Sequence, residues 1–311
     1  MAAFTSQALS SRAFSLRAFS PRVIVLCVAE ARPVVLAVSA MRYLTGAALA
    51  LPAVTVAVSL PRIAQGAAAW VLSILAIYLY NGVTDVTEDR INGSGRPIAR
   101  GDLRTRTASA VAVGAGCLAL LATWGLPAPM FWIVAANLVL GYLYSGPPVP
   151  LKDSSGGTVA VLCLSGLLSY LAGFTVATGG GGAALPAALV LFAGVAIGWM
   201  VFVGMPAKDL SDIAGDAAAG RRTLGVMLGE RASRQVMVGA AVVLLAGFAA
   251  AVSLTQVRLP GVVPALAAGV VAVAVAASCS GGDGRRGTRR PYGAFMGTQH
   301  LLHLTAFLSW I

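Results

Sequence analysis

Two groups of oxygen-bearing side chains are spaced along the sequence as metal ligands are spaced on helices. Residues three or four apart lie on one face of an α-helix, so each group would present its oxygens as a single stripe. Carboxylates in such a stripe repel one another unless a cation lies between them. The groups are Asn81, Asp85 and Asp89, and then Asp209, Asp212 and Asp216. They predict sites for a hard cation, with a solvated helix end as the alternative interpretation of the first group.

Basic residues stand beside both groups. Lys208 directly precedes Asp209, and Arg221 and Arg222 follow Asp216. Mg²⁺ prefers oxygen ligands, keeps some of its waters and takes further ligands from substrate phosphates. Two facing carboxylate stripes with cations beside them therefore predict a site for a diphosphate and Mg²⁺.

The elements that must position these groups are apolar. Of 311 residues, 58% are hydrophobic and 11% are charged, and the mean hydropathy is +0.84, whereas soluble domains carry about 25% charged residues. This composition excludes a water-soluble globular protein. It also excludes a disordered chain and a nucleic-acid-binding protein, because the net charge of +11 lies among apolar runs that approach the roughly 20 residues needed to cross a bilayer. An all-α, multi-pass integral membrane protein is predicted.

Apolar runs between polar or Pro/Gly breaks predict nine transmembrane helices. With a cytoplasmic N-terminus, all but three of the 22 Lys and Arg residues fall on the cytoplasmic side, as the positive-inside rule requires. All 11 acidic residues fall on that side too, and the rule does not demand this, so one membrane face holds the polar groups. The predicted spans are 33–53, 66–83, 107–125, 128–146, 157–178, 184–206, 235–257, 259–279 and 293–311.

The two motifs together resemble the UbiA superfamily of intramembrane prenyltransferases. The resemblance rests on N-x-x-x-D-x-x-x-D, on D-x-x-x-D within KDLSDIAGDAAAGRRTLGV, on Arg96-Pro97 and on YSGPPVPLK. It covers roughly residues 30 to 310 and agrees with the count of nine helices. The family's Tyr-x-x-x-Lys element is not reproduced, since Tyr144 and Lys152 are eight residues apart.

The resemblance implies nine helices in a ring around a central cavity, and two Mg²⁺ ions that join a prenyl diphosphate to the aspartates. Residues 29–311 would form this domain. On this interpretation Asp85, Asp89, Asp212 and Asp216 are catalytic, Asn81 and Asp209 complete the metal ligands, and the cations facing the diphosphate are Arg96, Lys152, Lys208 and Arg222.

The chemistry expected from this resemblance is the transfer of an isoprenyl group from its diphosphate to a lipophilic, aromatic acceptor within the bilayer. A terpene cyclase of the same fold, in which the substrate's own alkene attacks, is the alternative. A transporter is a third class, but it predicts acids near the bilayer midplane, whereas these acids cluster at one face.

Two residues outside the motifs, Arg42 and Tyr144, are also candidates for the site. Arg42 lies about ten residues into the first span, where a charge is costly and usually faces the bundle interior. We expect it, with Tyr144, to contact the acceptor or the cavity, and snorkelling or a structural ion pair is the alternative for Arg42. Residues 1–28 are predicted to be a disordered or interfacial tail. Only two of the 22 basic residues are lysine, and this, with the Ala, Gly and Val richness, favours a bacterial cell membrane over an organellar one.

Overall fold

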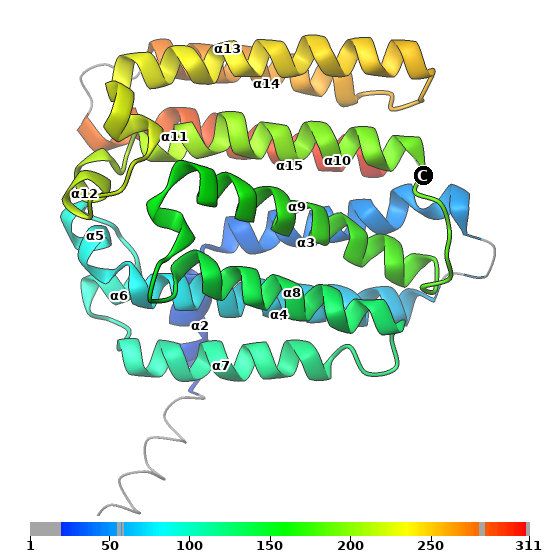
Figure 1. Ribbon diagram of the computed structural model, residues 1–311, viewed down its shortest axis with the longest axis horizontal. Helices are drawn as coiled ribbons and strands as arrows, with labels where there is room; N and C mark the ends of the chain where they lie inside the picture. The colour runs from blue at the N-terminus through cyan, green and yellow to red at the C-terminus, as the bar shows by residue number, and fades with distance from the viewer. Residues whose placement is uncertain (1–19, 55–56, 58, 280–283, 309–311) are drawn as a thin grey trace, which may run out of the picture.

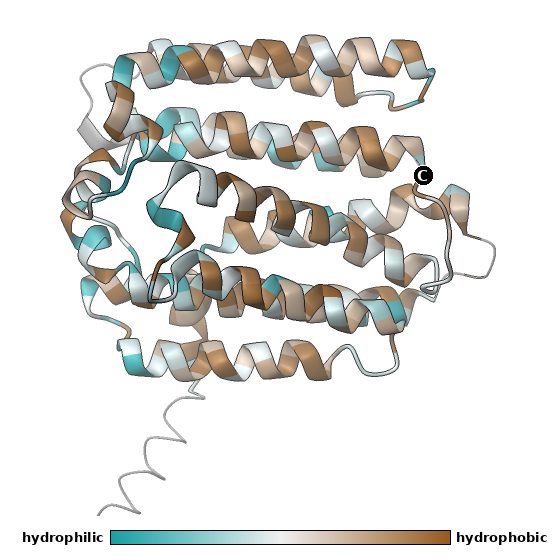
Figure 2. Ribbon diagram, in the orientation of Figure 1, coloured by the Kyte–Doolittle hydropathy of each residue, from teal (hydrophilic) through white to brown (hydrophobic). Residues whose placement is uncertain are grey.

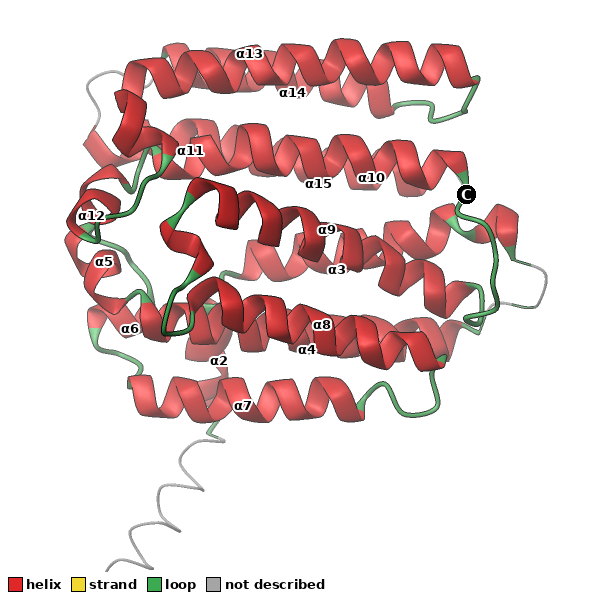
Figure 3. Cartoon of the chain, in the orientation of Figure 1, coloured by secondary structure: helices red, strands yellow, loops and turns green. Residues whose placement is uncertain are grey.

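The computed structural model describes residues 20–54, 57, 59–279 and 284–308. Apart from one isolated bridge between Ser154 and Arg222, these residues form helices and loops, without a strand (Figure 3). In chain order the elements are α2 (Pro21–Glu30), α3 (Pro33–Leu49), η1 (Leu51–Ala53), α4 (Leu60–Thr84), α5 (Val86–Ile91), α6 (Pro97–Arg100), α7 (Thr105–Leu121), α8 (Ala128–Ser145), η2 (Leu151–Asp153), α9 (Ser155–Ala177), α10 (Ala187–Trp199), η3 (Met200–Gly204), α11 (Met205–Asp209), α12 (Ile213–Ala218), α13 (Leu224–Thr255), α14 (Val262–Ser278) and α15 (Gly284–Leu308).

Each predicted span overlaps a helix in the described part of the chain. Six helical segments are long and apolar enough to cross a membrane. The apolar helices α7 and α14 have 17 residues each, and α15 begins with a run of basic residues. Nine crossings therefore stay a prediction. Residues 309–311 of the last predicted span lie outside the described residues.

The long helices run side by side, and successive ones alternate in direction (Figure 1). This alternation brings the end of α4 and the end of α11 to the same end of the bundle, together with the short helices α5, α6 and α12. Figure 2 shows hydrophilic residues gathered at that end and apolar residues along the helix bodies. The two acidic motifs, far apart in the sequence, therefore meet where the sequence analysis placed the polar face.

The helix α2 occupies part of the segment predicted as a tail. It begins at Pro21 and is capped by Ser20, whose side chain accepts a hydrogen bond from the Val23 amide. The helix buries Cys27 and Glu30. It packs on α4 and α6, so the end of the predicted tail is a packed helix. Residues 1–19 lie outside the described residues, and the domain boundary at residue 29 stays a prediction.

The contact between α3 and α9 depends on two glycines. A Cβ on Gly173 would overlap the carbonyl oxygen of Tyr43, and a Cβ on Gly46 would overlap that of Tyr170. Small residues at such positions let two helix backbones approach closely, and the resulting van der Waals packing favours helix association in a bilayer. Because α3 also packs on α15 and α4, and α9 packs on α8 and α10, this contact joins the two sides of the bundle.

Gly173→Ala is expected to destabilise the protein. The added methyl overlaps the backbone of α3, and overpacking of a tight contact costs about 1–3 kcal/mol. The control is Gly194→Ala on α10, where a Cβ meets nothing within 4 Å. Thermal melting in detergent should show a lower melting temperature for the first variant and an unchanged or higher one for the second. Equal melting temperatures would show that α3 and α9 do not pack as described.

Candidate active site

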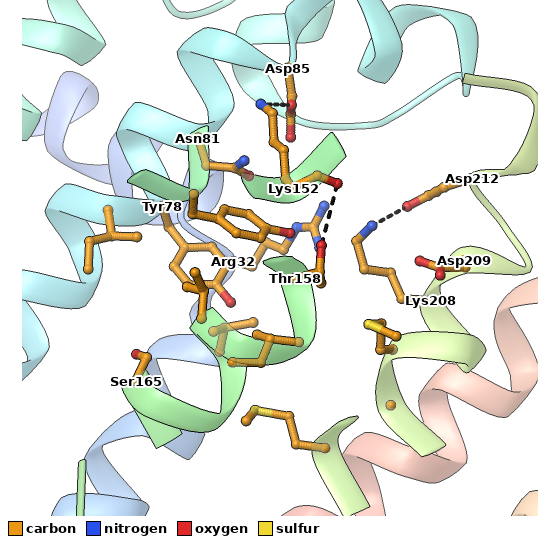
Figure 4. A pocket seen from close by; sticks show the side chains of 18 of the residues that line it. Arg32, Tyr78, Asn81, Asp85, Lys152, Thr158, Ser165, Lys208, Asp209 and Asp212 are labelled. Carbon is orange, nitrogen blue, oxygen red and sulfur yellow. Dashed lines mark hydrogen bonds and ion pairs between the residues drawn. The ribbon is translucent and has the colours of Figure 1, made fainter. Parts of the chain in front are cut away.

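A cavity of about 210 Å³ opens at the polar end of the bundle. All six predicted metal ligands line it. Figure 4 shows side chains from α4 on one side of this cavity and side chains from α11 and its following turn on the other. Below them the wall is mostly apolar, with contributions from α3, α4, α8, α9, η3 and α15: Val35, Val38, Ile74, Leu140, Leu162, Met200 and Phe295. Four polar side chains, Ser39, Arg42, Asn137 and Ser165, also line it.

The first motif surrounds the end of α4. The Asn81 amide donates to the Ser145 hydroxyl at 3.1 Å, which fixes the orientation of its side chain. Asp85 ends the helix and places its Oδ1 2.6 Å from Lys152 Nζ and 2.8 Å from Arg221 Nη2. Burial alone would raise the pKa of Asp85, but these two cations lower it below its ordinary value. Asp85 is therefore a carboxylate at neutral pH.

The second motif lies at the end of the 23-residue helical segment that α10, η3 and α11 form together. Pro206 in this segment cannot donate a backbone hydrogen bond. The π-helical turn η3 ends two residues before it, and π turns are common at functional sites. Lys208 and Asp209 then end this helix, and Lys208 Nζ lies 2.9 Å from Asp212 Oδ2. The pKa of Asp212 is lowered, because Lys208 outweighs the effect of burial.

Arg221 joins the two motifs. Its guanidinium contacts Asp85 at 2.8 Å and Glu88 at 2.9 Å in the first, and Asp216 at 3.1 Å in the second. It lies in the cavity wall, whereas Arg222, the arginine chosen from the sequence, is exposed and does not line the cavity. The two adjacent side chains lie in a short extended segment that pairs with Ser154, where neighbours point to opposite sides. The sequence alone could not decide which one faces inward.

The other predicted cations occupy different positions. Lys152, on η2, and Lys208 line the cavity directly. Arg96 is buried behind it and lies 2.8 Å from Asp89 Oδ2 and 2.7 Å from Glu30 Oε1. Arg96 therefore holds Asp89 in position rather than reaching the cavity itself. The sequence analysis missed Glu30, which α2 brings to this pair.

Arg42 and Tyr144 both line the cavity. Arg42 lies deeper, where its guanidinium donates to the Met200 sulfur at 3.1 Å. The structure thus places this costly charge in the bundle interior. Its contact with an acceptor or a diphosphate stays a prediction, as does that of Tyr144. Tyr78 also lines the cavity.

The oxygen-bearing side chains that line the cavity suit Mg²⁺ when the ion also binds a phosphate. In the part of the chain that the structure describes, no three acidic, His or Cys side chains are close enough to enclose a metal ion by themselves. The carboxylates instead face one another across the cavity, and the Asp216 Oδ2 atom is buried without a hydrogen bond to any described residue. Mg²⁺ usually takes one or two carboxylates together with substrate phosphates. The residues therefore fit ions that are shared with a diphosphate.

Comparison with known proteins agrees with this site. The model of the UbiA prenyltransferase family matches residues 34–297. The digeranylgeranylglyceryl phosphate synthase of Halobacterium salinarum is 36% identical over 216 residues, which cover 67% of this chain and 72% of that protein. That of Natronomonas pharaonis is 36% identical over 178 residues, and the match spans 56% of this chain and only 60% of that protein. The chain belongs to the UbiA prenyltransferase family, as the two motifs predicted.

The fold is shared with solved structures as well. A UbiA homologue from Archaeoglobus fulgidus, solved bound to GPP and Mg²⁺, matches with a TM-score of 0.67 at 20% sequence identity, over 91% of this chain and 99% of that one. The chain is thus an integral membrane protein of the UbiA fold. These named relatives come from archaea, so a bacterial cell membrane stays a prediction.

Proposed function

We propose that this protein transfers an isoprenyl group from a prenyl diphosphate to a lipophilic acceptor within the membrane. The observation that carries the proposal is the convergence of six oxygen-bearing ligands and three cations, Lys152, Lys208 and Arg221, on one cavity with a mostly apolar floor. A prenyl diphosphate has the matching form, with a polyanionic head and a hydrocarbon tail. Family membership and the relatives' names support the same class of reaction.

Different residues of the chain act on the diphosphate and on the prenyl group of the substrate. We propose that Asn81, Asp85 and Asp89 hold one Mg²⁺ and that Asp209, Asp212 and Asp216 hold the other. When bound, these ions would neutralise the negative charge that builds on the diphosphate as its bond to the prenyl carbon breaks. Lys152, Lys208 and Arg221 add fixed positive charge at the same place, which stabilises the leaving group most in the transition state.

The apolar wall acts on the other product of that cleavage. The allylic carbon is left electron-deficient, and water would trap it as an alcohol, so it needs dry surroundings. Tyr78 and Tyr144 line the cavity and offer aromatic faces, which attract cations. An electron pair of the acceptor then forms the new bond to this carbon, and the acceptor's proton passes to an oxygen of the released diphosphate.

The same proposal includes the topology expected from the sequence. Residues 29–311 would form one domain of nine crossings in a ring, with the N-terminus and both acidic motifs at the cytoplasmic face. The gathering of hydrophilic residues at one end of the bundle (Figure 2) supports a single polar face.

Product analysis tests the proposed reaction. Purified protein in detergent is incubated with geranyl, farnesyl or geranylgeranyl diphosphate, with Mg²⁺, and with or without aromatic and lipid acceptors, and the products are identified by mass spectrometry. We expect a prenylated acceptor. Release of a cyclic hydrocarbon without any acceptor would instead identify a terpene cyclase, and unchanged diphosphates under all conditions would reject both reactions.

A further inference from the structure

Glu30, the last residue of α2, is a fully buried acid that does not line the cavity. Its Oε1 lies 2.7 Å from Arg96 Nε, and its Oε2 accepts a hydrogen bond of 2.8 Å from the Ile98 amide. Burial raises the pKa of this carboxyl group, and Arg96 and the Ile98 amide act against that rise. Apolar residues of similar size are often no less stable than a buried ion pair, so stability alone does not account for Glu30.

Arg96 is held between Glu30 and the first motif. Its Nη1 donates to Asp89 Oδ2 at 2.8 Å, while its Nε lies against the Glu30 carboxylate. Nε and Nη2 also donate to the Glu30 carbonyl, and Nη2 donates to the Tyr78 carbonyl. All three nitrogens of the planar guanidinium thus have partners, which fixes the direction from which Arg96 meets Asp89.

The charges of this cluster leave Asp89 with a negative charge that faces the cavity. Two carboxylates, Glu30 and Asp89, share one guanidinium, so the three side chains together keep one negative charge. Asp89 lines the cavity, and Arg96 contacts its Oδ2. Without Glu30, the full charge of Arg96 would act on Asp89 and weaken its attraction for a cation.

The cluster lies tightly against the backbone of α4, inside the first motif. A Cβ on Gly82, which directly follows Asn81, would overlap Glu30 Oε1 and Arg96 Nη2. The helix α2 thus approaches α4 at the turn that carries the predicted metal ligands. Glu30 is the residue through which this contact reaches Asp89.

We propose that Glu30 is a positioning residue, which acts through Arg96 to orient Asp89 and to keep its negative charge available to Mg²⁺. The inference rests on the proposed function, in which Asp89 is a ligand of one ion. It makes α2, which occupies part of the segment expected to be a tail, a supporting element of the active site.

The Mg²⁺ dependence of substrate binding tests this role without requiring turnover. The full chain is placed in nanodiscs, and equilibrium binding of radiolabelled geranyl diphosphate is measured over a range of Mg²⁺ concentrations. Glu30→Gln keeps the size of the side chain and removes its charge, so the Mg²⁺ concentration for half-maximal binding should rise by about three- to tenfold. Glu30→Asp keeps the charge and shortens the side chain, and it should cause a smaller rise.

Two control variants separate this electrostatic effect from other changes. Glu230→Gln removes an exposed acid of α13 that pairs with Arg234 and does not line the cavity, and it should bind geranyl diphosphate like the parent protein. Cys27→Ala removes the Sγ of a buried residue three positions before Glu30 on the same face of α2. It should lower the melting temperature and leave the Mg²⁺ dependence unchanged.

Gly82→Ala tests the same contact without removing a charge. The added methyl would displace Glu30 and Arg96, so the Mg²⁺ concentration for half-maximal binding should rise here as well. Alanine favours a helix more than glycine does, so this variant remains informative if Glu30→Gln fails to fold. Its control is Gly114→Ala on α7, where a Cβ meets nothing within 4 Å.

Several results would overturn the proposal. An unchanged Mg²⁺ dependence in folded Glu30→Gln, or in Gly82→Ala, would show that the pair does not act on Asp89. A larger rise in Glu30→Asp than in Glu30→Gln would assign Glu30 to packing, as would an equal rise in Cys27→Ala. Failure of the proposed function would appear separately, as parent protein whose binding of geranyl diphosphate does not depend on Mg²⁺.

Discussion

Replacing Asp85 or Asp212 with asparagine is expected to lower kcat/KM roughly a hundred- to a thousand-fold, the loss that follows removal of one preorganised electrostatic group from an active site. Each substitution preserves the size of the side chain and removes one negative charge. The two residues lie on opposite sides of the cavity. Neighbouring cations lower the pKa of each carboxylate below its ordinary value, so we expect both to be ionised at neutral pH. The loss should therefore reflect weaker binding of the metal-diphosphate complex.

The control for these variants is Asp102→Asn. Asp102 is an exposed acid that pairs with Arg100 and does not line the cavity, so its loss should leave the rate unchanged. Melting temperatures separate catalysis from folding, because Asp85 also holds Lys152 and Arg221. Asp212 likewise holds Lys208 and accepts a hydrogen bond from the Ser211 hydroxyl, so the melting temperature of its variant is measured in the same way. Full activity in both folded variants would show that the acidic motifs are not the metal site.

Chelation is expected to have an equally large effect. EDTA should reduce turnover to the background rate, and Mg²⁺ in excess should restore it, because the acids that line the cavity would otherwise repel a diphosphate. The fully folded Asp212→Asn variant should require a higher Mg²⁺ concentration for half-maximal activity than the parent protein. The measurement is the initial rate as a function of free Mg²⁺.

Two outcomes of that titration would count against the proposed site. An unchanged rate in EDTA would mean that the cations of the chain alone stabilise the leaving group. Identical Mg²⁺ dependence in the parent and in Asp212→Asn would place the required metal elsewhere. Asp102→Asn again supplies the comparison for a simple loss of surface charge.

The sequence predicted the family and the placement of both motifs because these depend on short-range patterns. Spacings of three and four residues put Asp85 and Asp89, or Asp212 and Asp216, on neighbouring helical turns. Alternating apolar spans then bring the two motifs to one face, since each crossing reverses the direction of the chain. The placement of the motifs needed only helical periodicity and the thickness of a bilayer, whereas the family was inferred from the resemblance of the two motifs to a known one.

The contacts across the cavity could not be predicted in the same way. Arg221, and not Arg222, faces inward because a short extended segment follows Gly220, and the direction of its side chains depends on its pairing with Ser154. Glu30 reaches Arg96 only because α2 packs against α4 and α6. Such choices depend on how elements far apart in the sequence are packed, and neither residue type nor spacing encodes them locally.

The most direct test of the account follows the oxygen that joins the prenyl carbon to the diphosphate. Geranyl diphosphate labelled with ¹⁸O at this bridging position is incubated with the protein, Mg²⁺ and an acceptor, and both products are analysed by mass spectrometry. Cleavage of the carbon–oxygen bond, which the opposed aspartates and cations are proposed to promote, predicts that all of the label leaves with diphosphate and that Asp212→Asn releases little of it. Recovery of the label in a prenyl alcohol or in the prenylated product would show cleavage of a phosphorus–oxygen bond, and would contradict prenyl transfer at this site.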